Sequence, residues 1–486
     1  MSKARVKIEL RQCSLLMPIW FGLLISHGGE AAESLNRASS APQFDYTSKP
    51  AFYMSWAQFG AYYNETKLLR TLNSVSNLNL TLYHQPFAII LDGGWAAPTR
   101  DAQGKLYFDP LKFPSGTNVL KLIHDYGCKA MLWLEANGPD ITESSNTPST
   151  SGTNVEYDAK TIAEWGFDGA KFDLITDAET GTQKIAQVIR FVTAFRAVAT
   201  NRPTYFYHDV GVDMERDQFR DFPPGCVICE NSENDPDDIL YWTRTMMTHL
   251  WNVNGRNQWT CGREVYEAWA PPHPKPYNTS FLNVWSMLGS PYVFTAVTDA
   301  EHYPQYRDIY SRRECIALNN DPLYAPPVAL FHTTTNLGLT RRRSDGTLAV
   351  LAFNTTTNQT QSLTLQFSQL GLPEGHAADV RDIYYETNYG RFSDSFSFDL
   401  EPMQTKLLNF DSEGRQPILE ITKSPAQDCS VTVLGRPNQN IVLQGSTDLR
   451  SWFPLATNTL GLNPWVYQDD PARGGASQYY FRGVRP

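Results

Sequence analysis

The chain has 486 residues, of which 41% are hydrophobic and 19% are charged, and its formal net charge at pH 7 is −10. This composition excludes a disordered chain, and the length indicates one large domain with one or two smaller ones. The acidic balance argues against binding to a phosphate backbone, so we expect no nucleic-acid partner.

Residues 1–32 have the pattern of a secretory signal peptide. Four basic residues precede an apolar stretch over 13–25, and Ala31 and Ala32 supply small residues for cleavage. The apolar stretch is short for a membrane span, so we expect a secreted or periplasmic protein without membrane contact after the signal is removed. Removal takes Cys13 and leaves six cysteines, an even number that is compatible with disulfide bonds in an oxidising compartment.

Between residues 45 and 325, short apolar runs alternate with stretches of helical periodicity, which indicates parallel βα units. The predicted strands are 51–59, 87–91, 129–134, 169–172, 204–207 and 226–229, and the predicted helices are 65–82, 117–126, 157–165 and 183–199. The sequence therefore predicts a (β/α)8 barrel that forms the catalytic domain over residues 45–325.

Acidic residues stand at the end of one predicted strand after another: Asp92, Glu135, Asp173, Asp209 and Glu230. A single acid in this place is usually a helix N-cap, because its oxygen satisfies a free backbone N–H. Five acids on one rim are harder to explain as caps, since gathering carboxylates is costly and is typically kept for function. The carboxyl ends of the strands carry the active site in a barrel of this kind.

After residue 325 the helical periodicity gives way to short alternating runs separated by Gly, Asn and Ser. This pattern predicts an antiparallel, β-sandwich-like domain over 326–411. A polar link near 412–416 leads to a third unit, an accessory β-module over 416–486.

Several catalytic classes are excluded by their missing motifs. The sequence contains no H-E-x-x-H, no phosphate-binding Walker loop, no G-x-G-x-x-G between a strand and a helix, and no G-x-S-x-G elbow. We therefore expect no metal and no organic cofactor. Carboxylates on an aromatic-rich barrel rim are the equipment of glycoside hydrolysis, which indicates an oligosaccharide or polysaccharide as the partner.

The block from Asp92 to Asp173 resembles the melibiases, the α-galactosidase-type glycoside hydrolases of family 27. It contains Asp92-Gly93-Gly94-Trp95, then Arg100-Asp101-Ala102-Gln103-Gly104-Lys105-Leu106, Phe113-Pro114-Ser115-Gly116, and Trp165-Gly166-Phe167-Asp168-Gly169-Ala170-Lys171-Phe172-Asp173. The resemblance covers roughly residues 50 to 410. It implies a retaining mechanism in which Asp173 is the nucleophile and Lys171 contacts the sugar.

The resemblance also implies an acid/base in the loop after the sixth strand. Asp235 is the preferred candidate, because it lies 62 residues beyond Asp173 in an Asp-Pro-Asp-Asp context. Asp237, Asp238 and Glu230 remain alternatives, and Asp237 or Asp238 could equally cap the helix predicted from residue 239.

Five residues are implied to bind the sugar: Trp56, Asp92, Trp133, Lys171 and Asp209. For Trp56 and Trp133, packing in the core is an equally good interpretation. Glu135 has two readings as well, as a substrate ligand or as a helix cap.

The positions that differ from the family bear on which sugar is bound more than on the catalytic mechanism. Galactosidases of this type carry two adjacent acids after the second strand, whereas Asp92 is followed here by Gly93. The family's Glu after the fifth strand is replaced by Asp209. An α-galactoside is the leading substrate; the alternatives are another α-glycoside, a β-L-arabinopyranoside, or binding of carbohydrate without catalysis. The oligomeric state is not indicated by the sequence.

Overall fold

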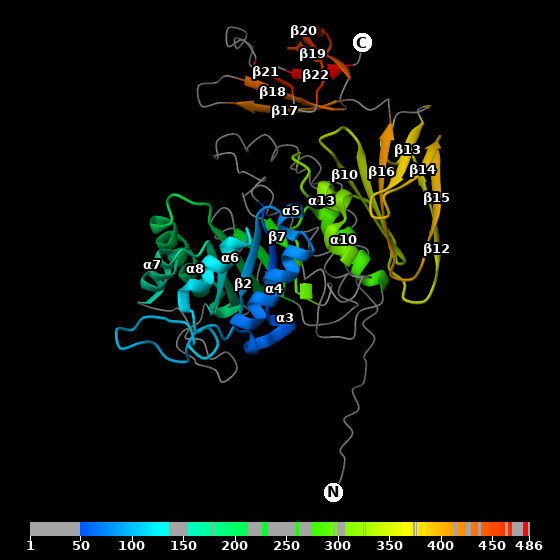
Figure 1. Cartoon of the computed structure of the whole chain (residues 1–486). Helices are drawn as coiled ribbons and strands as arrows, with labels where there is room; N and C mark the ends of the chain where they lie inside the picture. Colours follow the sequence, from blue (N-terminus) through cyan, green and yellow to red (C-terminus); the bar gives the residue numbers. More distant parts are fainter. Residues whose placement is uncertain are drawn as a thin grey trace.

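The computed structural model describes residues 49–135, 154–175, 178–211, 226–231, 259–261, 275–295, 297–298, 307–323, 325, 327–372, 375, 377–412, 417–423, 429–435, 439–461, 465–468 and 480–484. Eight parallel strands form one curled sheet in the order β7-β6-β5-β4-β3-β2-β1-β8, with helices on its outer side (Figure 1). The strands are β1 (Ala51–Met54), β2 (Phe87–Leu91), β3 (Lys129–Glu135), β4 (Gly169–Ile175), β5 (Tyr205–Gly211), β6 (Cys226–Asn231), β7 (Trp259–Cys261) and β8 (Val293–Phe294). The predicted (β/α)8 barrel is confirmed.

The helices of the barrel follow their strands as the sequence predicts, with two corrections. They are α3 (Trp56–Phe59), η2 (Gly60–Tyr62), α4 (Glu65–Asn77), α5 (Leu80–Tyr83), η3 (Gly116–Asn118), α6 (Val119–Asp125), α7 (Val155–Trp165), α8 (Ala178–Val198), α10 (Lys275–Leu288), η6 (Asp308–Ser311) and α13 (Arg313–Asn319). The strand predicted to reach residue 59 ends at Met54, because the chain turns into α3. The helix predicted over 65–82 is broken at Asn79, which adopts a left-handed conformation with φ of 55°.

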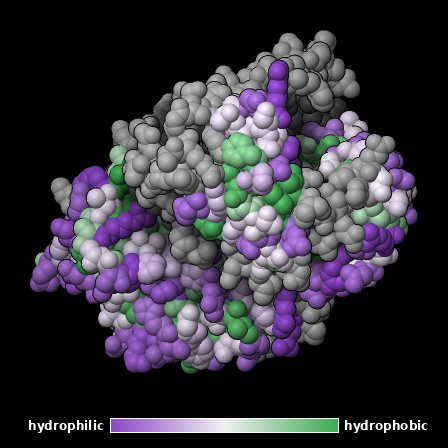
Figure 2. Space-filling view, turned by 90° about the horizontal axis from the view of Figure 1, so that it is seen from above, coloured by the Kyte–Doolittle hydropathy of each residue, from purple (hydrophilic) through white to green (hydrophobic). Residues whose placement is uncertain are grey.

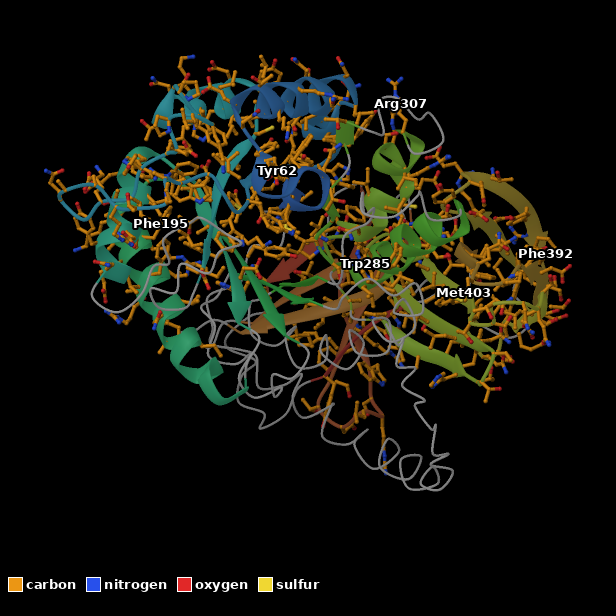
Figure 3. All side chains as sticks on the ribbon, turned by 90° about the horizontal axis from the view of Figure 1, so that it is seen from below. Tyr62, Phe195, Trp285, Arg307, Phe392 and Met403 are labelled. Carbon is orange, nitrogen blue, oxygen red and sulfur yellow. The ribbon has the colours of Figure 1, made fainter. Side chains whose placement is uncertain are left out.

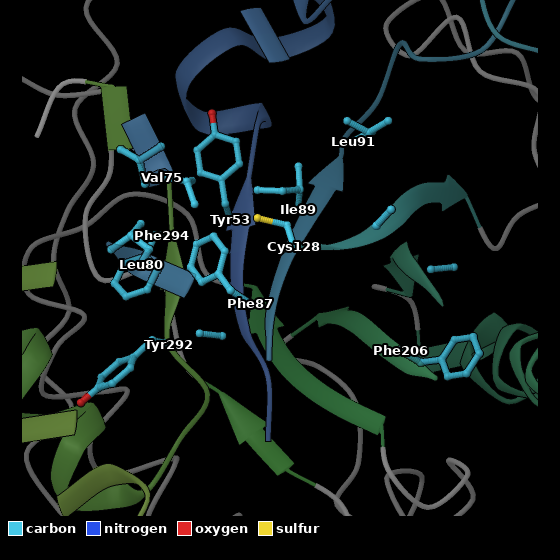
Figure 4. Close-up of a cluster of buried hydrophobic side chains, with 14 of the residues drawn as sticks. Tyr53, Val75, Leu80, Phe87, Ile89, Leu91, Cys128, Phe206, Tyr292 and Phe294 are labelled. Atoms are coloured by element: carbon cyan, nitrogen blue, oxygen red, sulfur yellow. The ribbon is translucent and has the colours of Figure 1, made fainter. Parts of the chain in front are cut away.

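Two apolar clusters lie on the two sides of the barrel sheet. Alternate strand residues fill the interior, as expected from the period of two along a strand: Phe52, Met54, Ala88, Ile90, Met131, Tyr205, Tyr207 and Val293. The intervening residues point outward to the helices, and Figure 4 shows part of this second cluster, including Tyr53, Phe87 and Ile89. The interior cluster fills the barrel beneath the carboxyl ends of its strands.

The second unit is made of two antiparallel sheets. A six-stranded sheet has the order β14-β13-β16-β11-β10-β9, and β12 pairs with β15 in a second sheet. Its strands are β9 (Val328–His332), β10 (Asn336–Arg342), β11 (Leu348–Asn354), β12 (Gln361–Gln366), β13 (Ala378–Asp382), β14 (Thr387–Phe392), β15 (Ser395–Leu400) and β16 (Thr405–Ser412). Every residue of β11 is buried, because one face meets the second sheet and the other faces the barrel.

Helix α10 joins this β-domain to the barrel. Asn283 donates its side-chain amide to Thr405 Oγ1 at 2.9 Å, and Ser280 Oγ donates to the carbonyl of Met403 at 2.9 Å. Figure 3 labels Trp285 of α10 and Met403 of the β-domain, one residue from each side of this contact. Arg341 of β10 is buried and donates to the carbonyl of Ser286 at 3.1 Å, so a cation completes the end of α10.

The third unit consists of two three-stranded antiparallel sheets around a small core of its own. The strands are β17 (Ile418–Lys423), β18 (Cys429–Leu434), β19 (Asn440–Ser446), β20 (Phe453–Thr459), β21 (Trp465–Gln468) and β22 (Tyr480–Val484). Figure 1 draws this module at the end of the barrel where α5 lies, whereas α3 lies at the opposite end. In the view from above, hydrophilic residues cover the flanks of the described surface and a hydrophobic patch lies near the middle (Figure 2).

Two of the six cysteines that lie beyond residue 32, Cys128 and Cys315, are buried free thiols. Burial raises the pKa of the Cys128 thiol to about 12. The side chains of the other four cysteines lie outside the described residues. Within the described part of the chain, no helix is long and apolar enough to cross a membrane.

Candidate active site

Asp173 lies in an irregular stretch of β4. Phe172 is opposite His208 on β5 and Ile175 is opposite Val210, so β4 carries one more residue than β5 across this interval. Such a bulge changes the direction of a side chain, and bulges are frequent beside active sites. The carboxylate of Asp173 is 17% exposed, which places it at the accessible end of an otherwise buried strand.

Lys171 lies between two carboxylates. Its Nζ is 3.2 Å from Oδ2 of Asp173 and 3.1 Å from Oδ2 of Asp92. Lys171 and Asp92 are both buried, with 4% and 1% of their side chains exposed. One cation shared by two acids leaves the cluster with a formal charge of −1, and burial makes each contact stronger than it would be in water.

The pKa of Asp92 lies above its usual value. Burial of the carboxyl is the main cause, and the positive charge of Lys171 opposes it, whereas the negative charge of Asp173 adds to the rise. The carboxyl also accepts a hydrogen bond from the N–H of Gly93 at 2.9 Å. The N–H of Asp92 donates to Ser55 Oγ at 3.1 Å, which fastens the end of β2 to the end of β1.

Trp133 of β3 contacts the same carboxylate oxygen as Lys171. Its indole N–H donates to Oδ2 of Asp173 at 2.8 Å, and its own carbonyl accepts from the indole N–H of Trp95 at 2.8 Å. Trp133 is the register partner of Lys171 on β4, two residues before Glu135 pairs with Asp173. Both tryptophans are buried. The indole N–H of Trp133 is therefore held in a position to donate to the carboxylate of Asp173.

Gly93 leaves room for two indole rings. A Cβ at this position would lie 3.3 Å from Cζ3 of Trp56 and 3.9 Å from Cδ2 of Trp133. Lys112 donates to the carbonyls of Ala61 and Gly94 and thereby ties the loops that follow β1 and β2. A side chain beside Asp92 would therefore press against the ring of Trp56.

The structure brings together five of the seven residues selected from the sequence: Trp56, Asp92, Trp133, Lys171 and Asp173. Trp56 begins α3 and does not end β1, which corrects its expected place. Asp209 lies in β5, two residues after Tyr207 and four after Tyr205, which both belong to the interior cluster. The side chain of Asp209 itself is outside the described part.

The choice among the acid/base candidates stays a prediction. Asp235, Asp237 and Asp238 lie outside the described residues, and so does the side chain of Glu230 at the end of β6. Glu135 is buried at the end of β3 beside the cluster. Among the described residues, no group of three or more His, Cys, Asp or Glu could hold a metal ion.

Two contributors were not selected from the sequence. Ser55 accepts the main-chain N–H of Asp92, and Trp95 donates to the main-chain carbonyl of Trp133. The Trp95 indole is visible in the sequence as part of the Asp92–Trp95 motif, but the motif does not say which carbonyl accepts its N–H. Ser55 carries no signal, because a serine after a strand is common in every fold.

Comparisons with known proteins match this chain to α-galactosidases. Residues 85–321 match the family model described as "Alpha galactosidase A", and residues 339–410 match "Alpha galactosidase C-terminal beta sandwich domain". A curated relative, an α-galactosidase of Cyamopsis tetragonoloba, is 22% identical, with 81% of this chain and 96% of the relative covered.

Solved structures share the fold at low identity. An α-galactosidase I from Mortierella vinacea superposes with a TM-score of 0.66 at 17% identity and covers 77% of this chain and 100% of its own. A family 27 β-L-arabinopyranosidase from Geobacillus stearothermophilus has a TM-score of 0.63 at 15% identity, covering 76% of this chain and 98% of its own.

Proposed function

This chain belongs to the α-galactosidase-type glycoside hydrolases of family 27, and on that premise we propose that it hydrolyses terminal α-galactosides with Asp173 as the nucleophile. The observation that carries the proposal is the Asp173 carboxylate at the mouth of the barrel, with Lys171 and Trp133 both within reach of its Oδ2. Double displacement requires such a carboxylate, ionised and fixed next to the anomeric carbon.

In the first step, an oxygen of Asp173 attacks the anomeric carbon and the bond to the leaving oxygen breaks. A general acid must give that oxygen a proton, and Asp235 is the residue that we propose for this role. The product is a glycosyl ester of Asp173. In the second step the same acid, now ionised, takes a proton from water, which attacks the anomeric carbon and releases the sugar with its original configuration.

Lys171 and Asp92 support the proposal as a binding pair. The ammonium of Lys171 stabilises the ionised form of Asp173 before attack and again when the ester breaks. Asp92 is held by Lys171 and by the N–H of Gly93, so its remaining acceptor capacity has a fixed direction. A carboxylate held in this way suits recognition of sugar hydroxyls, whose O–H groups donate to it.

A second candidate substrate is supported by the packing at Gly93. The resemblance to galactosidases implies a second acid there for the sugar's hydroxymethyl side, whereas Gly93 has no side chain and lies against the ring of Trp56. A β-L-arabinopyranoside differs from an α-galactoside by lacking the hydroxymethyl group, so it does not need that acid. An apolar wall accommodates the smaller sugar without leaving a polar group unpaired.

A panel of 4-nitrophenyl glycosides distinguishes the two substrates. We expect the α-galactoside to have the highest kcat/KM and the β-L-arabinopyranoside to be second, with the product first appearing in its original configuration by NMR. A higher kcat/KM for the arabinoside selects the second candidate. Inversion of configuration, or release from no member of the panel, contradicts the proposal.

We also propose that the protein is exported and that disulfides form afterwards. The first 32 residues supply the signal, and four cysteines besides the free thiols Cys128 and Cys315 lie beyond them. An even number of cysteines suits pairing in an oxidising compartment. Mass spectrometry of the exported protein with and without reduction tests both points; a retained N-terminus or an unchanged mass on reduction contradicts one of them.

A further inference from the structure

Trp133 has a role that sequence reasoning did not assign, because it contacts the reacting group itself. Its indole N–H donates to Oδ2 of Asp173 at 2.8 Å, and the Nζ of Lys171 lies 3.2 Å from that same oxygen. Two donors that converge on one oxygen fix the rotation of the carboxylate about its Cβ–Cγ bond. The oxygen that attacks the sugar is thereby held in one direction.

The indole of Trp133 is fixed in turn by its surroundings. The carbonyl of Trp133 accepts the indole N–H of Trp95, and the strand pairing sets Trp133 beside Lys171. The main chain at Gly93 lies close against the ring, as the 3.9 Å between its would-be Cβ and Cδ2 of Trp133 shows. Only 5% of Trp133 is exposed, so little water competes for the N–H.

We propose that Trp133 is a positioning residue for the nucleophile, and not a platform on which the sugar stacks; this rests on the assignment of Asp173 made above. The N–H stabilises the carboxylate before attack. When the glycosyl ester forms, Oδ2 becomes the carbonyl oxygen and still accepts the hydrogen bond, more weakly. When water cleaves the ester, the charge returns to the carboxylate and the N–H again stabilises it.

The role makes a demand that a packing role does not. A donor to the ionised carboxylate favours ionisation, so its loss moves the acidic limb of the pH–rate profile to higher pH. The loss also slows the chemical steps more than it weakens substrate binding, because the donor orients the attacking carboxylate in the first step and stabilises the departing carboxylate in the second. A stacking platform has the opposite signature, since its loss raises KM and leaves the acidic limb in place.

The test compares Trp133→Phe and Trp133→Tyr in the full chain, with 4-nitrophenyl α-galactoside as the substrate. For Trp133→Phe we expect kcat to fall about tenfold to a hundredfold with little change in KM, and the acidic limb to move up. For Trp133→Tyr we expect part of kcat to return, because the phenol supplies an O–H donor. Trp285→Phe is the matched control: it removes a buried indole of α10 that is not one of the described partners of Asp173, and it should leave the acidic limb in place.

A spectroscopic measurement covers the case in which Trp133→Phe does not fold. In Asp173→Asn, the indole N–H resonance of Trp133 should move to lower frequency because its acceptor loses its charge, whereas that of Trp285 should not move. A Trp133→Phe protein with the wild-type kcat and acidic limb, or a Trp133 resonance unaffected by Asp173→Asn, overturns the proposal. If Asp173→Gly itself remains active, the nucleophile assignment fails instead, so the two failures are distinguishable.

Discussion

Two aspartates, one just before β4 and one near its carboxyl end, have different surroundings. Asp168, just before the first residue of the strand, is 3% exposed and accepts from the N–H of Ala130 at 2.9 Å. It is also 2.8 Å from His124 Nε2 and 3.4 Å from Lys129 Nζ. Asp173, five residues later and about 16 Å away along the strand, is more exposed and shares Lys171 with a second acid.

The difference separates stability from catalysis. Burial alone would raise the pKa of Asp168, but the hydrogen bond with His124, the N–H of Ala130 and the charge of Lys129 outweigh it, and the pKa lies below its usual value. Asp168 is therefore satisfied as an anion by the fold. At the other end, the acids outnumber their cation, and burial raises the pKa of Asp92. Such unbalanced charge is typical of sites that bind or react.

Replacing Asp173 by Gly should have the largest effect. We expect hydrolysis to fall on the order of 10⁵-fold, because the nucleophile is lost while the fold is kept. With an activated aryl glycoside, added azide should occupy the vacated space and attack the anomeric carbon directly. The product, identified by NMR, should be a glycosyl azide of inverted configuration.

The wild-type protein in azide is the control for this experiment, and its rate should not rise. An Asp173→Gly protein that keeps substantial hydrolysis would show that another group attacks the sugar. The catalytic role that we assign to Asp173, near the carboxyl end of β4, would then be wrong.

Replacing Asp168 by Asn should destabilise the folded protein and leave catalysis nearly unchanged. We expect the free energy of unfolding near pH 7 to fall by about 1–3 kcal/mol, because three partners lose a buried charge. The kcat of the folded protein should stay within about twofold of wild type, since the site lies at the far end of the strand. Urea unfolding and steady-state kinetics measure the two quantities.

The pH dependence sharpens this prediction. A carboxyl whose folded-state pKa is lowered stabilises the protein above its unfolded pKa of about 3.9, and that stability is lost as the pH falls through the folded value. The deficit of Asp168→Asn should therefore shrink below about pH 4. Asp125→Asn is the matched control: this exposed acid forms an i,i+4 ion pair with Lys121, and its loss should cost less than about 0.5 kcal/mol. An equal deficit at pH 3 and pH 7 would contradict the ionic account of Asp168.

How far the sequence predicts this molecule depends on what each residue must satisfy. The five residues of β2 were bounded correctly because all are apolar and buried, and the positions of Lys171 and Asp173 follow from the period of a strand. The break at Asn79 was missed because helical periodicity continues through it. No pattern states that the N–H of Trp133 points to Asp173, since the direction depends on strands β3 and β4 meeting in register.

The packing at Gly93 lies beyond sequence reasoning for a related reason. The missing acid was visible, but the sequence does not show whether water, a sugar or a protein group fills the space. The ring of Trp56 lies against Gly93, and Lys112 ties the segments after β1 and β2 together. Contacts between loops depend on the whole barrel, so a reading of each segment alone cannot supply them.

The smallest effect is expected from the accessory β-module. Deleting residues 416–486 should leave kcat/KM for a 4-nitrophenyl glycoside within about twofold of wild type. The module has a core of its own, around Val431, Val433, Ile441 and Leu443, and the described contacts of Asp173 all come from the barrel. Figure 1 draws it at the α5 end, away from α3 at the mouth. The full-length protein, assayed in parallel for its melting temperature and for the same substrate, is the reference. A truncated protein that melts as a folded domain yet loses turnover of this small substrate would show that the module completes the site, and the division between a catalytic end and a stabilising end of the barrel would have to be redrawn.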